Sequence, residues 1–199
     1  MSTTDQRIVA ANIVLTLDGR YHGAGGPGDM AAIVPYASTE TARNHLGTIH
    51  ENATTGVLGR ANAEGFLGYW SAVAVDDNAD PRDRAYAKWL LDTEKVIFST
   101  TVTEMPWEHV RVVNAPAAEV ITELKSVGTG EILVNTSPTI TKALLAADLI
   151  DRLYLLITPE ITGGGEQLFV DGLPASHWQL TSHQVGELGE LAVVYDRKH

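Results

Sequence analysis

The feature that most constrains this chain is the alternation of short apolar runs with longer segments of helical periodicity. Residues 7–20 form a continuous apolar run that ends at Asp18-Gly19, which predicts a strand buried on both faces and closed by a turn. Strands are also expected at 54–60, 95–101, 110–114, 131–135 and 151–160, and helices at 38–53, 80–92, 116–128 and 137–149. Strands that alternate with helices predict a mainly parallel sheet covered on both faces.

The helix at 80–92 has the clearest boundary signals. Asp80 is a suitable N-cap, Pro81 stands at the first helical position, and Ala85, Trp89 and Leu90 share one face. Residues 61–70, which include "GFLGYW", are expected to be looser.

The last third of the chain changes character. Residues 177–186 and 191–197 read as two strands of an antiparallel hairpin joined by "ELGE". The glycines of "TGGGEQLF" at 162–169 follow a proline and lead into no clear helix, so they predict a tight connection rather than a phosphate loop. The sheet should therefore be mixed, in one α/β domain that spans residues 1–199.

Composition excludes several function classes. The 14 Lys and Arg residues against 25 Asp and Glu residues give a net charge of −11, which argues against nucleic acid and anionic membranes as partners. No run approaches the ~20 apolar residues of a membrane span, and residues 1–7 lack the features of a signal peptide. The absence of cysteine suits a cytoplasmic protein and removes any thiol nucleophile.

The turn between the strand at 131–135 and the following helix is the first candidate site. One reading is simple helix initiation, with Ser137 as cap and Pro138 as first helical residue. The other is that the helix N-terminus binds a pyrophosphate, assisted by the hydroxyls of Thr136, Ser137, Thr139 and Thr141. Taken alone, the motif favours helix initiation.

Two other strand ends carry polar groups. Gly59 permits close approach or an unusual backbone angle, and Arg60 offers a guanidinium suited to phosphate. Ser99, Thr100 and Thr101 offer hydroxyls to a ribose or an adenine. Because ligands of open α/β sheets bind beyond the carboxyl ends of the strands, these ends together predict a dinucleotide cleft.

Other chemical groups are weaker candidates. Asp18 is most simply a turn residue, although its carboxyl group is also a candidate to orient a substrate amide or donate a proton. The seven histidines do not have metal-ligand spacing, so no metal site is expected. No Gly-x-Ser-x-Gly elbow occurs, which leaves nucleophilic hydrolysis without support.

Four segments, in order, resemble the RibD C-terminal domain family, the reductase half of the bifunctional riboflavin-biosynthesis deaminase-reductase and a relative of dihydrofolate reductase. They are "LTLDG", "LGRANAEGF", "KVIFSTTV" and "DLIDRLYLLITPEITGGGEQLF", and the resemblance covers nearly the whole chain. It implies a dihydrofolate-reductase-like three-layer fold, in a stand-alone form, with a mixed, mainly parallel sheet and a C-terminal antiparallel hairpin. The deaminase domain has no counterpart here, so deamination is not expected.

The resemblance implies hydride transfer from NADPH, with NADH as the alternative cofactor, to a small heterocyclic, imine or masked-carbonyl substrate. Homodimers are common in the family. Asp18 would act in catalysis and face the substrate together with Asn135, and the glycine-rich loop 23–28 would close as a lid. The cofactor would be held by Leu15, Thr16, Gly59, Arg60, Ser99, Thr100, Thr101, Thr136, Ser137, Pro138 and Thr139.

Departures from the family pattern keep two alternatives open. In the riboflavin enzymes the turn reads Val-Glu-x-Gly-Pro-Thr-Leu, whereas here Asn135 replaces the substrate-binding Glu and Ser137 replaces the Gly. Thr100 stands where the family often has Arg, and Asn62 replaces a Thr. The chain is thus either a working reductase, a non-catalytic ligand-binding relative with a degenerate cofactor turn, or the 5-amino-6-(5-phosphoribosylamino)uracil reductase itself.

Overall fold

The computed structural model describes residues 7–198, which build one eight-stranded sheet with the order β4-β3-β2-β5-β1-β6-β8-β7. The strands are β1 Val9–Thr16, β2 Ala53–Gly59, β3 Glu94–Phe98, β4 Val110–Val113, β5 Glu131–Asn135, β6 Arg152–Thr158, β7 His177–Val185 and β8 Leu191–Lys198. Neighbours from β4 to β6 are parallel, whereas β6, β8 and β7 pair antiparallel. The mixed, mainly parallel sheet with a C-terminal hairpin is confirmed.

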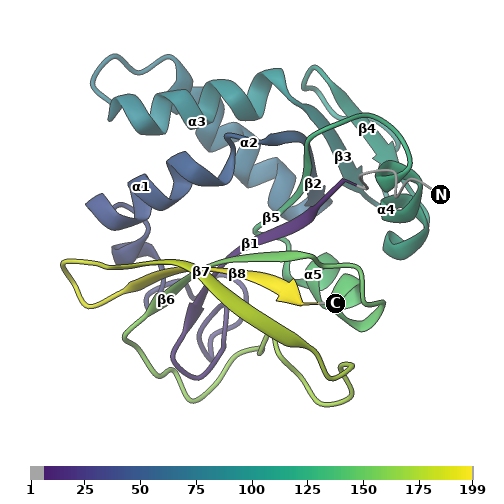
Figure 1. Cartoon of the computed structure of the whole chain (residues 1–199). Helices are drawn as coiled ribbons and strands as arrows, with labels where there is room; N and C mark the ends of the chain where they lie inside the picture. Colours follow the sequence, from purple (N-terminus) through teal and green to yellow (C-terminus); the bar gives the residue numbers. More distant parts are fainter. Residues whose placement is uncertain (1–6, 199) are drawn as a thin grey trace.

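Helices cover both faces of the sheet (Figure 1). The helices α1, α2 and α3 pack on one face, and α4 and α5 pack on the other. Alternate residues of the central strand β1 serve the two layers: Ala11 and Ile13 enter the core under α4 and α5, whereas Ala10 meets α1. The helices are α1 Glu40–Ile49, α2 Arg60–Ala74, α3 Pro81–Asp92, α4 Ala117–Lys125 and α5 Pro138–Ala146, with a short 3₁₀ helix at Val34–Tyr36.

Two local predictions are wrong. The segment expected to be loose is the fifteen-residue helix α2, in which Ala63, Leu67 and Trp70 are buried at helical spacing. Two glycines lower the intrinsic helix propensity of this segment, but tertiary packing of the buried face overrides that preference. In α3, Asp80 does cap the helix through a hydrogen bond from Arg82 N, but Ala85 is exposed and the buried face is formed by Tyr86, Ala87 and Leu90.

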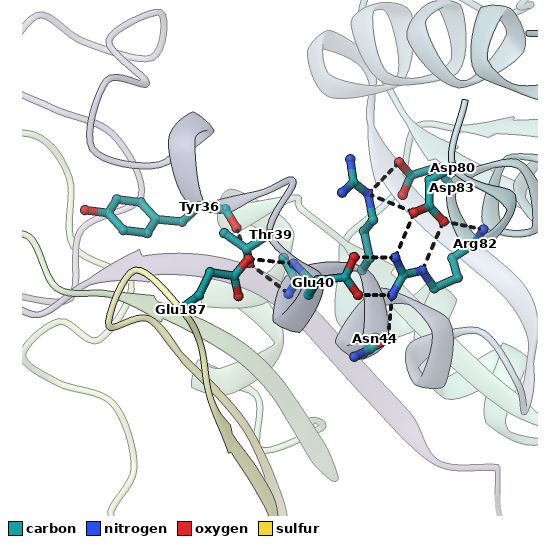
Figure 2. Close-up of polar contacts among 10 residues, drawn as sticks. Tyr36, Thr39, Glu40, Asn44, Asp80, Arg82, Asp83 and Glu187 are labelled. Atoms are coloured by element: carbon teal, nitrogen blue, oxygen red, sulfur yellow. Dashed lines mark hydrogen bonds and ion pairs between the residues drawn. The ribbon is translucent and has the colours of Figure 1, made fainter. Parts of the chain in front are cut away.

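A charged network, which we call the Arg82 network, ties α1 to α3 and to the β7–β8 turn (Figure 2). The Arg82 guanidinium donates to both carboxylate oxygens of Glu40 at 2.8 and 2.9 Å and to the Asp80 carboxylate at 2.7 and 3.0 Å. Glu40 N in turn donates to the Glu187 carboxylate at 3.0 Å. Because the side chains of Arg82, Glu40 and Asp80 all reach solvent, the network joins the surfaces of these elements rather than their cores.

Candidate functional site

A pocket of ≈ 280 Å³ lies at the carboxyl ends of three parallel strands. Its wall consists of Arg60 after β2, residues 98–101 at the end of β3 and residues 113–115 at the end of β4. The structure therefore brings together Arg60, Ser99, Thr100 and Thr101, as the sequence predicted from the strand ends. The pocket has the position expected for a ligand of an open α/β sheet.

The polar groups around this pocket differ in their exposure and in the partners that they already have. The Arg60 side chain is 38% exposed and pairs with Glu64 one helical turn away at 2.9 Å. Ser99 is buried, and its Oγ accepts hydrogen bonds from the backbone N–H of Thr101 and Val102. The hydroxyls of Thr100 and Thr101 belong to exposed residues, so they can meet a ligand without displacing Ser99.

The first turns of α2 and α5 meet beside the pocket. Gly59 N donates to Ser137 Oγ at 3.0 Å, which links the N-cap residues of the two helices. Pro138 begins α5 and Ser137 is its N-cap residue, as predicted, but the Ser137 side chain makes no capping hydrogen bond, because its hydroxyl donates to Asn135 O at 2.9 Å. Since Gly59 has no side chain and the Ser137 hydroxyl does not bond to α5, no N-cap side chain occupies the first-turn N–H groups of either helix, and these groups stay available to an anion.

Gly59 itself has an ordinary extended backbone, with φ −79° and ψ 149°. A Cβ atom there would lie 3.9 Å from Ile140 Cδ1, which is a normal contact. The prediction of an unusual backbone angle at Gly59 is therefore wrong, and only close approach of a ligand remains as a reason for glycine.

Thr136 holds the strained position of the β5–α5 turn. Its φ is +43°, which is rare for a β-branched residue. Its Oγ1 accepts a hydrogen bond from Asn62 Nδ2 at 2.8 Å, and its N–H donates to Asn12 O at 2.9 Å. Of the four hydroxyls proposed for phosphate, those of Thr136, Ser137 and Thr141 thus bond to protein groups, and Thr139 is the exposed one.

Asn135 lies at the centre of this turn and is fully buried. Its amide oxygen accepts from Asn12 Nδ2 at 2.9 Å, and its amide nitrogen donates to the Tyr86 hydroxyl. We call the connected residues the Asn135 network: Asn12, Asn62, Tyr86, Asn135, Thr136 and Ser137. In this arrangement the Asn135 side chain, predicted to bind substrate, meets protein groups on both sides.

Asp18 anchors a loop rather than standing free. Its carboxylate accepts from Thr16 Oγ1 at 2.6 Å, Arg20 Nε at 2.8 Å and the backbone N–H of Gly163 at 3.1 Å. The Thr16 hydroxyl and the Arg20 guanidinium hold the pKa of Asp18 well below its usual range. The carboxyl group is therefore ionised at neutral pH and suited to accept hydrogen bonds, not to donate a proton.

The end of β1 and the glycine-rich loop are packed against residues 160–168. Thr16 O accepts from Gly19 N, and Leu15 is buried, so the predicted carboxamide contacts lie at a closed turn. A Cβ atom at Gly165 would lie 2.1 Å from His22 O, which shows that residues 162–166 form the tight connection predicted for them. The loop 23–28 contains internal turns, such as Gly23 N to Asp29 O at 2.8 Å.

Sequence reasoning missed Asn12 and Tyr86, which bond to Asn135. It also missed the contact of Asn62 with the turn and the place of Asn114 in the pocket wall. Asn12 interrupts an otherwise apolar strand, and that polar residue was the available signal. Tyr86 is 49 positions from Asn135, and nothing in its helix marks the contact. Across residues 7–198, neither a group of three metal-binding side chains nor a helix able to cross a membrane is found.

Comparison with known proteins finds matches over nearly the whole chain. A Bacillus subtilis (strain 168) protein called uncharacterized protein YyaP is 23% identical over 96% of this chain and 95% of its own length. A Shewanella sp. PV-4 structure assigned provisionally to riboflavin biosynthesis superimposes with a TM-score of 0.72 at 19% identity, over 96% of this chain and 99% of that one.

Two further structures share the fold of this chain. The deaminase/5-amino-6-(5-phosphoribosylamino)uracil reductase of Thermotoga maritima matches 98% of this chain and 58% of its own with a TM-score of 0.65 at 13% identity. Enterococcus faecalis dihydrofolate reductase, solved with NADP(H), matches 98% of both chains with a TM-score of 0.57 at 17% identity. These likenesses establish the dihydrofolate-reductase-like fold.

The family model for the RibD C-terminal domain matches residues 7–190, from the strand β1 to the turn before β8. The chain belongs to the RibD C-terminal domain family.

Proposed function

We propose that the protein is an NAD(P)H-dependent reductase of a small heterocyclic, imine or masked-carbonyl substrate. The observation that carries the proposal is the meeting of two helix N-termini, α2 and α5, at the Gly59–Ser137 hydrogen bond. Free first-turn amides and two helix dipoles together favour a pyrophosphate at this place. Membership of a family related to dihydrofolate reductase supports a nicotinamide cofactor.

The pocket beside these helices suits the adenosine end of the cofactor. Arg60 is the cation among its lining residues, and Thr100 and Thr101 offer hydroxyls to a ribose. A guanidinium forms strong charge-assisted bonds with a 2′-phosphate, so NADPH is the expected cofactor. Because Thr100 contributes no second charge, the pocket also accommodates the NADH ribose.

A bound nicotinamide supplies a hydride at C4 to the substrate. The backbone around Leu15 and Thr16 is proposed to receive the carboxamide, and Asp18 to hold the neighbouring loop and orient a substrate amide. Its lowered pKa makes Asp18 an acceptor in this role. The exposed loop 23–28 is proposed to close over the nicotinamide, with its base fixed against Gly165.

The proposed substrate is uncharged. Apart from Arg60, which is proposed to bind the cofactor, two cations lie around the ends of β1 and β5, and each is paired with a carboxylate: Arg20 with Asp18 and Lys142 with Glu166. A phosphate group on the substrate would have to compete with Asp18 for Arg20 or with Glu166 for Lys142. This argues against the ribosylamino-pyrimidine of riboflavin biosynthesis.

A specific observation favours a second candidate, a ligand-binding relative without catalysis. Hydroxyls of Thr136 and Ser137 are bonded to Asn62, Asn135 and Gly59, and are thereby withdrawn from a phosphate. In this case the pocket near Arg60 would bind a nucleotide-like ligand without hydride transfer.

Titration with NADPH and with NADH, by calorimetry and tryptophan fluorescence, tests the proposal. Micromolar affinity for either, about −8 kcal/mol, is expected. Arg60→Gln should weaken NADPH about tenfold and NADH much less. Arg84→Gln is the matched control, because Arg84 is 37% exposed, also has one carboxylate partner, and lies outside the pocket. No binding of either cofactor at millimolar concentration would replace the reductase with the ligand-binding relative.

We also propose a cytoplasmic homodimer of this single domain, paired through β7. This nine-residue strand lies at the end of the sheet, and its sequence, "HWQLTSHQV", contains no Lys, Arg, Asp or Glu. Edge strands of monomers are usually protected by charge or proline, so an uncharged edge favours pairing with a second copy. A monomeric mass in sedimentation equilibrium at micromolar concentration would contradict the dimer.

A further inference from the structure

The β5–α5 turn, which contains Thr136, is contacted by residues that are distant in the sequence. Thr136 keeps a left-handed φ of +43° although its side chain is β-branched. Such a conformation persists only where the surrounding structure over-determines it. The contacts of the Asn135 network therefore indicate what keeps the turn in place.

Asn135 is the hub of those contacts. Its backbone carbonyl accepts from Asn62 Nδ2 at 3.2 Å and from Ser137 Oγ at 2.9 Å, so that it binds both the first turn of α2 and the start of α5. Its side-chain amide is bonded at both ends, to Asn12 and to Tyr86. Asn12 selects the orientation of this amide, because a flip of Asn135 would place its amide nitrogen against the amide nitrogen of Asn12, and the Tyr86 hydroxyl then occupies the other end.

Tyr86 belongs to another layer of the structure. It comes from α3, has no exposed surface, and reaches Asn135 from the face of the sheet that is covered by α1, α2 and α3. Its ring is fixed by neighbouring aromatic rings, with centroids of Trp70 at 4.6 Å and Trp89 at 5.4 Å. The hydroxyl position is thus set by the packing of α2 and α3, independently of the turn.

We infer that Tyr86 is a positioning residue, which fixes the Asn135 amide through its hydroxyl and thereby holds the Thr136 turn so that the first-turn amides of α2 and α5 face one ligand phosphate. The identity of that ligand, the pyrophosphate of NADPH or NADH, rests on the proposed function. The claim that Tyr86 holds the Thr136 turn does not rest on the proposed function, because it concerns the protein without ligand.

The first experiment removes the hydroxyl. In free Tyr86→Phe, deuterium exchange in peptides covering residues 134–141 should accelerate at least fivefold, and the Kd for NADPH should rise about tenfold. The matched control is Tyr154→Phe, another buried tyrosine on the same face of the sheet, whose hydroxyl meets Arg152 instead of the turn. It should leave both quantities unchanged.

The second experiment is a rescue. Glycine adopts a positive φ without steric cost, so a Thr136→Gly turn needs less support. In the Thr136→Gly background, Tyr86→Phe should therefore change the Kd for NADPH less than twofold. If Tyr86→Phe only destabilised the fold, it would lower the Tm equally in the wild-type and Thr136→Gly backgrounds. The weaker binding of NADPH would then persist in the Thr136→Gly background.

The outcomes separate the two proposals. Unchanged exchange at 134–141 in Tyr86→Phe, equal effects in Tyr154→Phe, or a tenfold loss that persists in the Thr136→Gly background each overturn the positioning role. Failure of the wild-type protein to bind either cofactor overturns the reductase instead, and the exchange measurement alone then decides whether Tyr86 holds the turn.

Discussion

The Asn135 network and the Arg82 network both join elements that are distant in sequence, yet they use opposite chemistry. Around Asn135 the groups are uncharged amides and hydroxyls, and Asn135 and Tyr86 have no exposed surface. Around Arg82 the groups are ions, with 33% of the Arg82 side chain and 66% of the Glu40 side chain exposed. Both networks include α3, one from its buried face and one from its N-terminus.

The difference shows which kind of contact specifies geometry in this protein. Neutral hydrogen bonds in the interior contribute modestly when made, but leaving their partners unpaired costs the full desolvation of each group. Exposed ion pairs are screened by salt and contribute little. We therefore expect the buried network to define the turn and the exposed network to adjust the packing of α1 on α3.

The largest effect is expected from Asn135→Leu. The substitution leaves Asn12 Nδ2 and the Tyr86 hydroxyl buried without their partner, so the free energy of unfolding should fall by about 4 kcal/mol. Urea unfolding followed by circular dichroism would measure it. Asn78→Leu, at an exposed position between α2 and α3, is the control and should cost less than about 0.5 kcal/mol. Equal losses in the two variants would contradict the special contribution of the buried Asn135 network.

An intermediate effect is expected at His45, on the buried face of the helix whose N-terminus carries Glu40. Burial lowers the pKa of His45 to about 4, and Nε2 has no hydrogen-bond partner within the described residues. The unfolded chain binds this proton near pH 6.5, so stability should decline as the pH falls from 6.5 to 4, by up to roughly 3 kcal/mol.

His45→Leu should flatten this decline, as measured by urea unfolding at pH 7, 6 and 5. The exposed His183 provides the control, because His183→Gln should leave the slope unchanged. A slope that survives in His45→Leu would assign the acid sensitivity to other groups.

The smallest effect is expected from Arg82→Gln. The Tm should fall by less than about 2 °C at 0.15 M NaCl and be unchanged at 1 M, because both ion pairs reach solvent and are screened by salt. Arg82 holds the pKa values of Glu40 and Asp80 below their usual range. Its stabilisation is therefore present above about pH 4 and is lost as the pH falls further, below the window of His45.

Scanning calorimetry at the two salt concentrations would measure the Arg82→Gln shift, with Lys88→Gln as a control for an ordinary pair within one helix. A decrease in Tm above about 5 °C that persists at 1 M NaCl would mean that the Arg82 network stabilises the protein as strongly as the buried Asn135 network.

Local patterns predicted most of the fold. Continuous apolar runs marked the parallel strands, because both faces of these strands are covered. The helix α2 was missed because Gly65 and Gly68 suggested a loop, whereas packing of Leu67 and Trp70 decided the conformation. The buried face of α3 was predicted wrongly, because Tyr86 is buried and contacts Asn135 of the distant strand β5. Helical periodicity alone does not show such a contact.

The candidate site was predicted in part. Polar residues at strand ends were sufficient to group Arg60 with residues 99–101, since parallel strands end at one edge. The direction of each side chain was not predictable: Ser137 bonds to Gly59 N instead of its own helix, and Asp18 receives a backbone N–H from Gly163, 145 residues away. Such partners depend on the whole sheet being assembled.

That dependence has a consequence for biosynthesis. The strand β1 lies between β5 and β6, and its register pairs Val9 with Ile132, so the first strand to leave the ribosome gains its first neighbour 123 residues later. At about 5–20 residues per second, the nascent chain carries an unpaired, almost wholly apolar strand for roughly 6–25 s. During that interval the central strand of the finished sheet is the segment that a chaperone would have to cover.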